Sequence, residues 1–192
     1  MSKQQEILTI AREVIHSKGY QATSISDILS SAKIGKGQFY HYFSSKHDLG
    51  LAVVENFIQE WDQKLILDIL KSGDDPVSKL NNMLDWTVSY HSDMDSKTGC
   101  PFGNLAIEMS EHDELFRLKI QHFFERWIDG IQNVLDEMVE KNLFNDTIDT
   151  EKHAQTLIAM LEGGILLMKS QQDMKWFLNV VEVIRQQYNL SY

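Results

Sequence analysis

The segment Thr23–Lys46 constrains the fold more than any other part of this chain, because it encodes two short helices around a tight turn. Apolar residues at helical spacing indicate the first helix, and Thr23 or Ser24 can supply the oxygen that caps its first turn. Gly35 and Gly37 lower the steric cost of a sharp turn at the start of the second helix. Two short helices joined in this way form a helix-turn-helix.

The two faces of the second helix differ in chemistry. Phe39 and Phe43 are four residues apart, so they lie on one face and can pack against the first helix. The other face carries potential hydrogen-bond donors, namely Lys36, Gln38, Tyr40 and His41. Each of these residues taken alone is most often a solvated surface residue or a core aromatic, whereas their joint spacing favours contact with DNA.

The run from Gly35 to Lys46, read GKGQFYHYFSSK and followed by Asp48-Leu49, resembles the DNA-binding domain of TetR-type transcriptional repressors. The resemblance is close over about the first 50 residues and continues beyond them only as a helical pattern. Two positions depart from the family pattern. Lys33 stands where the family usually has the turn glycine, and Gly35 stands where it often has a capping Ser or Thr.

The resemblance implies an all-α fold of about nine helices. Residues 1–47 would form a three-helix helix-turn-helix domain, and residues 48–192 a larger effector-binding and dimerisation domain. The implied function is that of a homodimeric repressor, which a small-molecule effector releases from a palindromic double-stranded DNA operator. An activator or a constitutive architectural DNA-binding protein would share the same fold.

The resemblance also assigns roles within the motif. Base-facing positions are occupied by Ser26, Lys36, Gly37 and Gln38. Phosphate-facing positions are occupied by Thr23, Ser24, Tyr40, Tyr42 and Lys46, and His41 completes the predicted DNA-binding set. The chemistry suits these roles, because glutamine can pair with adenine, lysine can reach the acceptors of guanine, and a lysine at a helix start adds a cation beside free N–H groups.

The net charge of -10 is divided unevenly along the chain. Residues 1–50 hold six basic and four acidic side chains, a net charge of +2, whereas the other residues hold 12 basic and 24 acidic ones, a net charge of -12. The positive part contains the motif. Phosphate contacts need local cations rather than a basic protein as a whole, so this distribution is compatible with DNA binding.

The remaining composition narrows the class of protein. No apolar run approaches the roughly 18 residues of a membrane span, and the polar N-terminus does not resemble a secretory leader, so we expect a cytoplasmic protein without a membrane partner. One cysteine excludes an internal disulfide framework. The sequence lacks HExxH, paired-cysteine, G-x-S-x-G and P-loop motifs, so we predict no metal, no cofactor and no catalytic residue.

Helical periodicity continues through the rest of the chain. The predicted helices cover about residues 3–18, 46–70, 76–92, 101–109, 153–170 and 174–188, and a further helix runs from the capping box at Ser110 to Met138. Breaks are expected at 71–75, 93–99 and 142–149. Asp75 before Pro76 reads as an N-cap, and capping boxes are expected at Ser45–Asp48 and Ser110–Asp113.

The pair Gly163-Gly164 lies inside a predicted helix, where each glycine costs about 0.8 to 1 kcal/mol relative to alanine. In TetR-like proteins the last two helices form a four-helix bundle with their copies, so close helix approach at a dimer interface can compensate this cost. The predicted interface comprises Leu161, Gly163, Gly164, Trp176, Val180 and Ile184. A simple kink beside a bulky neighbour is the alternative.

Large side chains between Trp61 and Trp127 are candidates for an effector pocket, because the corresponding helices surround the effector cavity in TetR-like proteins. The candidates are Trp61, Met83, Trp86, Tyr90, Cys100, Phe102, Met109, Phe123 and Trp127. For any one of them, ordinary core packing is the alternative.

Cys100 precedes Pro101, a residue favoured at the first helical position, so it is expected as an N-cap. A helix N-terminus favours the reactive thiolate, which allows a repressor that senses electrophiles or oxidants. The alternatives are a buried cysteine that packs as a small hydrophobe and a Cys100-dependent enzyme, for which no histidine can be assigned as the base.

Overall fold

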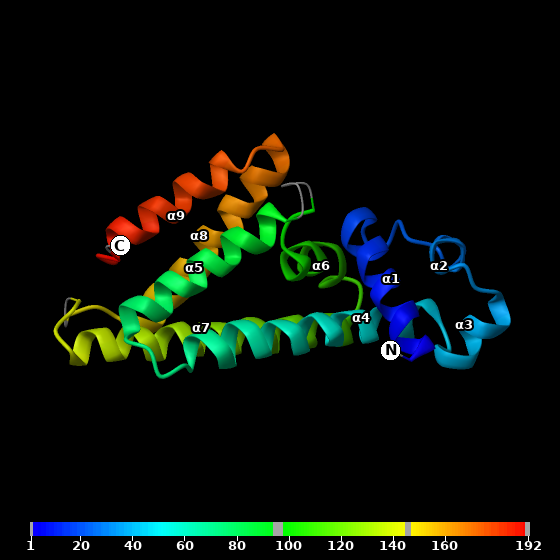
Figure 1. Cartoon of the computed structure of the whole chain (residues 1–192), viewed down its shortest axis with the longest axis horizontal. Helices are drawn as coiled ribbons and strands as arrows, with labels where there is room; N and C mark the ends of the chain where they lie inside the picture. The colour runs from blue at the N-terminus through cyan, green and yellow to red at the C-terminus, as the bar shows by residue number, and fades with distance from the viewer. Residues whose placement is uncertain (1, 94–97, 145–146, 191–192) are drawn as a thin grey trace. The chain divides into compact units, whose positions relative to one another are not determined.

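A computed structural model describes residues 2–93, 98–144 and 147–190, and in these ranges the regular elements are helices, with no strand. The predicted all-α class is therefore confirmed. Nine α-helices, labelled in Figure 1, and one π-helix follow one another along the described residues. They are α1 (Lys3–Lys18), α2 (Ile25–Ala32), α3 (Lys36–Tyr42), α4 (Lys46–Trp61), η1 (Asp62–Leu70), α5 (Pro76–Ser92), α6 (Pro101–Met109), α7 (Glu114–Glu140), α8 (Thr150–Gln171) and α9 (Lys175–Gln187).

The chain divides into two compact units. The first comprises Met1–Gln59 and Pro101–Gln121, and the second comprises Glu60–Cys100 and His122–Tyr192. The helix-turn-helix therefore belongs to the same unit as α6, although the two are far apart in the sequence. Residues 94–97 and 145–146, which lie in two of the predicted breaks, are outside the described residues.

The starts of α4 and α5 follow the predicted capping residues. The Asp75 carboxylate accepts a hydrogen bond from the Ser78 backbone N–H at 3.0 Å, and Pro76 is the first residue of α5. At α4, the Ser45 hydroxyl accepts from the Asp48 N–H at 3.0 Å. The Asp48 carboxylate accepts from the Ser44 N–H at 2.8 Å, so it reaches one residue further back than the predicted box.

The capping box expected at Ser110 is wrong. The Ser110 backbone N–H still donates to Ala106 at the end of α6, at 3.1 Å. Asp113 caps α7 instead, because its carboxylate accepts from the N–H groups of Leu115 and Phe116 at 3.0 and 3.1 Å. A carboxylate can satisfy two free N–H groups at once, whereas a hydroxyl at Ser110 would lie in the preceding turn.

The predicted α-helix over residues 46–70 changes type at Asp62. From there to Leu70 the chain is a π-helix, and the Lys71 N–H donates to the Ile66 carbonyl at 2.9 Å. The segment packs against α7 at Gly130, where an added Cβ would lie 2.9 Å from Leu70 Cδ1. Arg126 of α7 binds Asp62 with a shortest distance of 2.9 Å. Periodicity of apolar residues does not distinguish this helix type from an α-helix.

Candidate nucleic-acid interface and effector site

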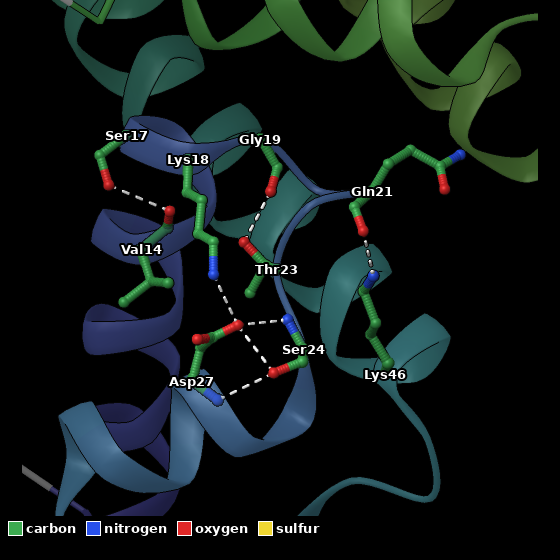
Figure 2. A network of polar contacts seen from close by, with 9 residues as sticks. All are labelled: Val14, Ser17, Lys18, Gly19, Gln21, Thr23, Ser24, Asp27 and Lys46. Carbon is green, nitrogen blue, oxygen red and sulfur yellow. Dashed lines mark hydrogen bonds and ion pairs between the residues drawn. The ribbon is translucent and has the colours of Figure 1, made fainter.

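A polar network fixes the start of α2 (Figure 2). The Ser24 hydroxyl accepts from the Asp27 N–H at 3.1 Å, and the Asp27 carboxylate accepts from the Ser24 N–H at 2.7 Å, which completes a capping box. Lys18 of α1 donates to the same carboxylate at 2.8 Å. The Lys18 ammonium and then the Ser24 donors hold the pKa of Asp27 well below its usual value. The network therefore ties α2 to the end of α1.

The loop between α1 and α2 is held from two sides within the first unit. Glu108 of α6 accepts hydrogen bonds from the backbone N–H groups of Tyr20 and Gln21, at 2.9 and 2.5 Å. Gly19 has φ +91°, and a Cβ there would lie 3.1 Å from a Glu108 oxygen. Only glycine combines this backbone conformation with such close approach at low cost. Sequence reasoning missed Glu108, because its partners are backbone groups 87 and 88 residues away.

The predicted phosphate contacts Thr23 and Lys46 serve the same loop. Thr23 is only 2% exposed, and its hydroxyl donates to the Gly19 carbonyl at 2.6 Å. Lys46 donates to the Gln21 carbonyl at 3.3 Å (Figure 2). Its Nζ also lies over the Tyr20 ring, 4.5 Å from the ring centroid. Partial burial lowers the pKa of Lys46. The Thr23 side chain is therefore positioned to support the loop rather than to reach a phosphate.

The turn between α2 and α3 accommodates both departures from the family pattern. Lys33 adopts the left-handed conformation that glycine usually supplies, with φ 52° and ψ 47°. Gly35 is the N-cap of α3 and provides no side-chain hydrogen bond to it. An added Cβ on Gly35 or Gly37 would meet no atom within 4 Å. Nothing inside the described chain therefore requires glycine at residue 37, which lies within α3.

The four predicted base-facing residues, Ser26, Lys36, Gly37 and Gln38, are all exposed. Phe39 and Phe43 are buried, as the pattern predicted, and fix the orientation of α3. The exposed predicted residues are Ser24, Ser26, Lys36, Gly37, Gln38, Tyr40 and His41, and the half-buried ones are Tyr42 and Lys46. Within the described ranges, Ser26, Lys36 and Gln38 make no side-chain hydrogen bond or ion pair with the rest of the chain. Their polar atoms are available to an external partner.

The second unit contains a cluster of aromatic rings around Trp61. The ring centroids of Trp86, Tyr90, Phe123 and Trp127 lie 4.8, 5.1, 5.8 and 5.9 Å from that of Trp61. The Trp127 indole donates to the Met83 sulfur at 3.4 Å. These six side chains, hereafter the Trp61 cluster, were all predicted pocket residues, and the structure brings them together.

Two other predicted pocket residues belong to the first unit. Phe102 packs against Phe57, with 6.2 Å between the ring centroids, and the Met109 sulfur accepts from the Gln21 amide at 3.4 Å. Both contacts involve the part of the chain that includes the helix-turn-helix. The predicted pocket set is therefore divided between the two units.

Cys100 has a partner that the sequence does not reveal. The thiol is buried, directly before α6, and donates a hydrogen bond to the carboxyl group of Glu162 on α8. Burial is the main influence on Glu162 and raises its pKa. No group of three potential metal-ligating residues occurs in the described part of the chain.

The predicted interface residues on α8 and α9 differ in how far they are buried within one chain. Leu161 and Ile184 are 0% exposed and belong to the core of a single chain. An added Cβ at Gly164 would lie 3.0 Å from Phe177 and 3.1 Å from Val180, so this glycine admits α9 close to α8. Gly163 is exposed and has no atom within 4 Å of an added Cβ. Val180 is half-buried and Trp176 is 43% exposed.

These helices also expose apolar side chains that the sequence pattern did not single out. They are Leu166, Leu167, Leu178 and Val183, each at least 44% exposed. Helical spacing places Gly163, Leu166 and Leu167 on one side of α8, and Trp176 and Val183 on one side of α9; we call these five residues the α8–α9 apolar face. Helical periodicity identified these helices but not which of their apolar residues lack cover within one chain.

Two family models match the chain. Residues 7–53 match the model described as bacterial regulatory proteins of the tetR family, and residues 76–183 match that of the LmrA/YxaF-like transcriptional regulator C-terminal domain. The first match contains α2 and α3, and the second contains most of the Trp61 cluster and the α8–α9 apolar face. No helix among the described residues is long and apolar enough to cross a membrane.

Individual proteins resemble the chain over most of its length. A Lactococcus lactis subsp. lactis protein named "Uncharacterized HTH-type transcriptional regulator in lacX 3'region" is 38% identical over 93% of this chain and 87% of its own. The transcriptional repressor DhaR of Mycobacterium sp. (strain GP1) is 27% identical over 92% and 89%. A TetR-family regulator from Agrobacterium tumefaciens has the same fold, with a TM-score of 0.88, 23% identity and 96% coverage of both chains.

Proposed function

Because this chain belongs to the TetR family of bacterial transcriptional regulators, we propose that it is a homodimeric repressor which a small-molecule effector releases from a palindromic operator. In this proposal residues 1–47 bind DNA, and residues 48–192 bind the effector and the second subunit. Repression is favoured by the relative DhaR, whose name includes the word repressor. Such a protein acts in the bacterial cytoplasm, where its operator lies.

The exposed side of α3 is the observation that carries the proposal. Lys36 and Gln38 are exposed and have no partner in the described chain, although both are long side chains rich in hydrogen-bond donors. Gly37 costs helix stability and gives no packing advantage within the described residues. A duplex that approaches the α3 backbone closely accounts for all three residues.

The proposed contacts fall into two classes. Ser26, Lys36 and Gln38 read base edges, with Gly37 admitting the duplex close to α3. Ser24, Tyr40, His41, Tyr42 and Lys46 position the helix against phosphates, and Thr23 acts only through the loop that it supports. The Lys46 ammonium is held by Gln21 and Tyr20, so its charge is oriented before DNA binds.

The α8–α9 apolar face is the proposed dimer interface. Exposed leucines together with a tryptophan leave more apolar surface on two neighbouring helices than one chain covers. The open space at Gly163 allows a helix of the second copy to approach closely. The two DNA-binding domains of such a dimer are related by a two-fold axis. They fit a palindrome whose half-sites lie about one turn of the DNA helix, or a multiple of it, apart.

The Trp61 cluster is the proposed effector site, because pockets for small organic molecules are lined mainly by aromatic and apolar side chains. We propose a non-covalent effector. The covalent alternative keeps one favourable feature, the position of Cys100 directly before α6. Against it, the thiol is only 2% exposed and is engaged by the Glu162 carboxyl group, so it is poorly accessible to an electrophile.

Selection of bound duplexes from a random library, followed by gel-shift assays, tests the proposal. We expect a two-fold symmetric site, and DNA release by an effector should persist in Cys100→Ser. Gln38→Ala should change base preference at one position by about 1 to 3 kcal/mol, whereas Lys46→Ala should weaken binding to all sequences alike. Failure to enrich any sequence, or an equal loss on specific and random DNA for both variants, would contradict the proposed reading head.

A further inference from the structure

Glu162 carries a buried carboxyl group in which one oxygen lacks a hydrogen-bond partner among the described residues. The Cys100 thiol donates one hydrogen bond to this carboxyl group. Its atom Oε1 is buried, yet it has no hydrogen-bond partner in the described residues. Buried carboxyl oxygens are almost always paired, because an unpaired one loses its hydration without compensation. An orphaned oxygen of this kind indicates a missing donor.

No basic residue of the described chain supplies that donor. The influences on the Glu162 carboxyl are burial and the Cys100 thiol, without a contribution from Lys or Arg. The two buried basic side chains of the same unit are bound to other carboxylates. Arg185 binds Asp85 at 2.7 Å, and Lys79 binds Glu137 at 2.8 Å. The fold thus pairs other buried cations and leaves this acid unmatched.

Ring contacts lead from α8, the helix that carries Glu162, to the Trp61 cluster. Phe177 of α9 packs on α8 at Gly164, two residues from Glu162. The same ring lies 5.6 Å from the buried His91 ring, which lies 5.2 Å from Tyr90 of the cluster. Glu162, Cys100 and the cluster all belong to the second unit. The rings offer apolar area and π faces, which attract cations.

We infer that the effector of this regulator is an organic cation, an aromatic or bulky apolar molecule whose positive or N–H donating group is bound by Glu162. This inference rests on the proposed function, since it names the ligand class of the proposed effector site. A cation supplies both the donor that Oε1 lacks and the charge that makes ionisation of the buried acid favourable. An anionic effector would instead place two like charges together in a dry site.

Shape-matched ions of opposite charge test the inference directly. We would titrate the full-length protein by calorimetry and thermal denaturation with tetraphenylphosphonium and tetraphenylborate, and with the smaller pair phenethylammonium and 3-phenylpropionate. At least one cation should bind and raise the melting temperature, and its anionic match should not. Glu162→Gln should weaken cation binding by about 10- to 100-fold, the range expected for loss of a charge-assisted hydrogen bond.

Two controls separate charge recognition from general damage. Glu151→Gln removes an exposed carboxylate from the same helix and should leave cation binding unchanged. Glu162→Gln should fold at least as stably as the wild type, because an amide is cheaper to bury than an ionisable acid. Binding of neither cation, equal binding of cation and anion, or an unchanged cation affinity in Glu162→Gln would each overturn the inference.

The operator distinguishes failure of this inference from failure of the proposed function. Glu162→Gln without ligand should bind the selected operator as the wild type does. If operator binding is intact but only neutral or anionic molecules release the DNA, the inference is wrong and the proposed function stands. If the wild type selects no operator, the proposed function itself fails.

Discussion

Glu108 of α6 accepts a hydrogen bond from the backbone N–H of Tyr20 at 2.9 Å, across 88 positions of sequence. The same carboxylate accepts from the next N–H, that of Gln21. The loop that carries α1 into α2 is therefore held by a side chain that lies outside the helix-turn-helix sequence. Correct placement of α2 depends on α6 as well as on the local caps.

Replacement of Glu108 by alanine tests this dependence. Glu108→Ala leaves two backbone donors without their acceptor, so we expect the free energy of unfolding to fall by about 1 to 3 kcal/mol. Urea denaturation measures the change. Glu111→Ala is the matched control, since Glu111 is exposed in the following turn and should cost under about 0.5 kcal/mol. Equal losses in the two variants would show that the loop does not need this carboxylate.

Gly37→Ala should change stability and DNA binding in opposite directions. The added methyl group meets no atom of the described chain and improves helix propensity, so the free energy of unfolding should rise by about 0.5 to 1 kcal/mol. The same methyl group should lower operator affinity if the duplex approaches the α3 backbone. Gly73→Ala, in an open loop, should leave gel-shift affinity unchanged. Wild-type affinity in Gly37→Ala would remove the case for close approach.

Charge placed on the α8–α9 apolar face should separate the subunits. Leu166 is 57% exposed and Val183 is 51% exposed, so glutamate at both positions leaves the core of one chain intact. Light scattering should report the mass of a monomer, and circular dichroism should report unchanged helical content. The affinity for the operator should fall because the subunits no longer bind the two half-sites together. Leu67→Glu, on the exposed side of η1, is the control and should remain dimeric. A dimeric double variant would place the interface elsewhere.

Asp27 makes the stability of the helix-turn-helix domain dependent on pH. Because Lys18 and Ser24 depress its pKa in the folded protein below the ordinary 3.8, folding favours the ionised carboxylate. Its stabilisation is complete above about pH 5 and is lost as the pH falls toward the folded pKa. The melting temperature of Asp27→Asn should therefore lie below that of the wild type at pH 7, and the gap should narrow between pH 5 and 3. A gap that is constant across this range would contradict the linkage.

Local features of the fold were predictable because they depend on neighbours in sequence. The cap at Asp75 and the buried pair Phe39 and Phe43 follow from spacing and residue type alone, whereas the cap of α2 was predicted only as Thr23 or Ser24. The cap of α7 was misplaced to Ser110, since both Ser110 and Asp113 are good capping residues and only the length of α6 decides between them.

Tertiary partners were not predictable in the same way. An apolar residue at helical spacing is expected to be covered, but the spacing does not say whether its cover comes from its own chain. Leu161 is covered within one chain, whereas Leu166, on the same helix, is not. Likewise, no pattern connects Cys100 with Glu162, because the contact arises from the packing of helices distant in sequence. The candidate site could be assigned to elements, but not to all of its residues.

The fluorescence of the tryptophans can report on both effector binding and subunit association. Trp61, Trp86 and Trp127 lie together in the cluster, whereas Trp176 stands 43% exposed on α9. Buried indoles emit at shorter wavelengths than hydrated ones, so the emission spectrum combines a blue-shifted group with one red-shifted reporter. Trp176→Phe isolates the first group, whose quenching follows occupation of the cluster. The difference between the wild-type and Trp176→Phe spectra is the emission of Trp176. Its change on dilution follows dissociation of the subunits, without an attached dye.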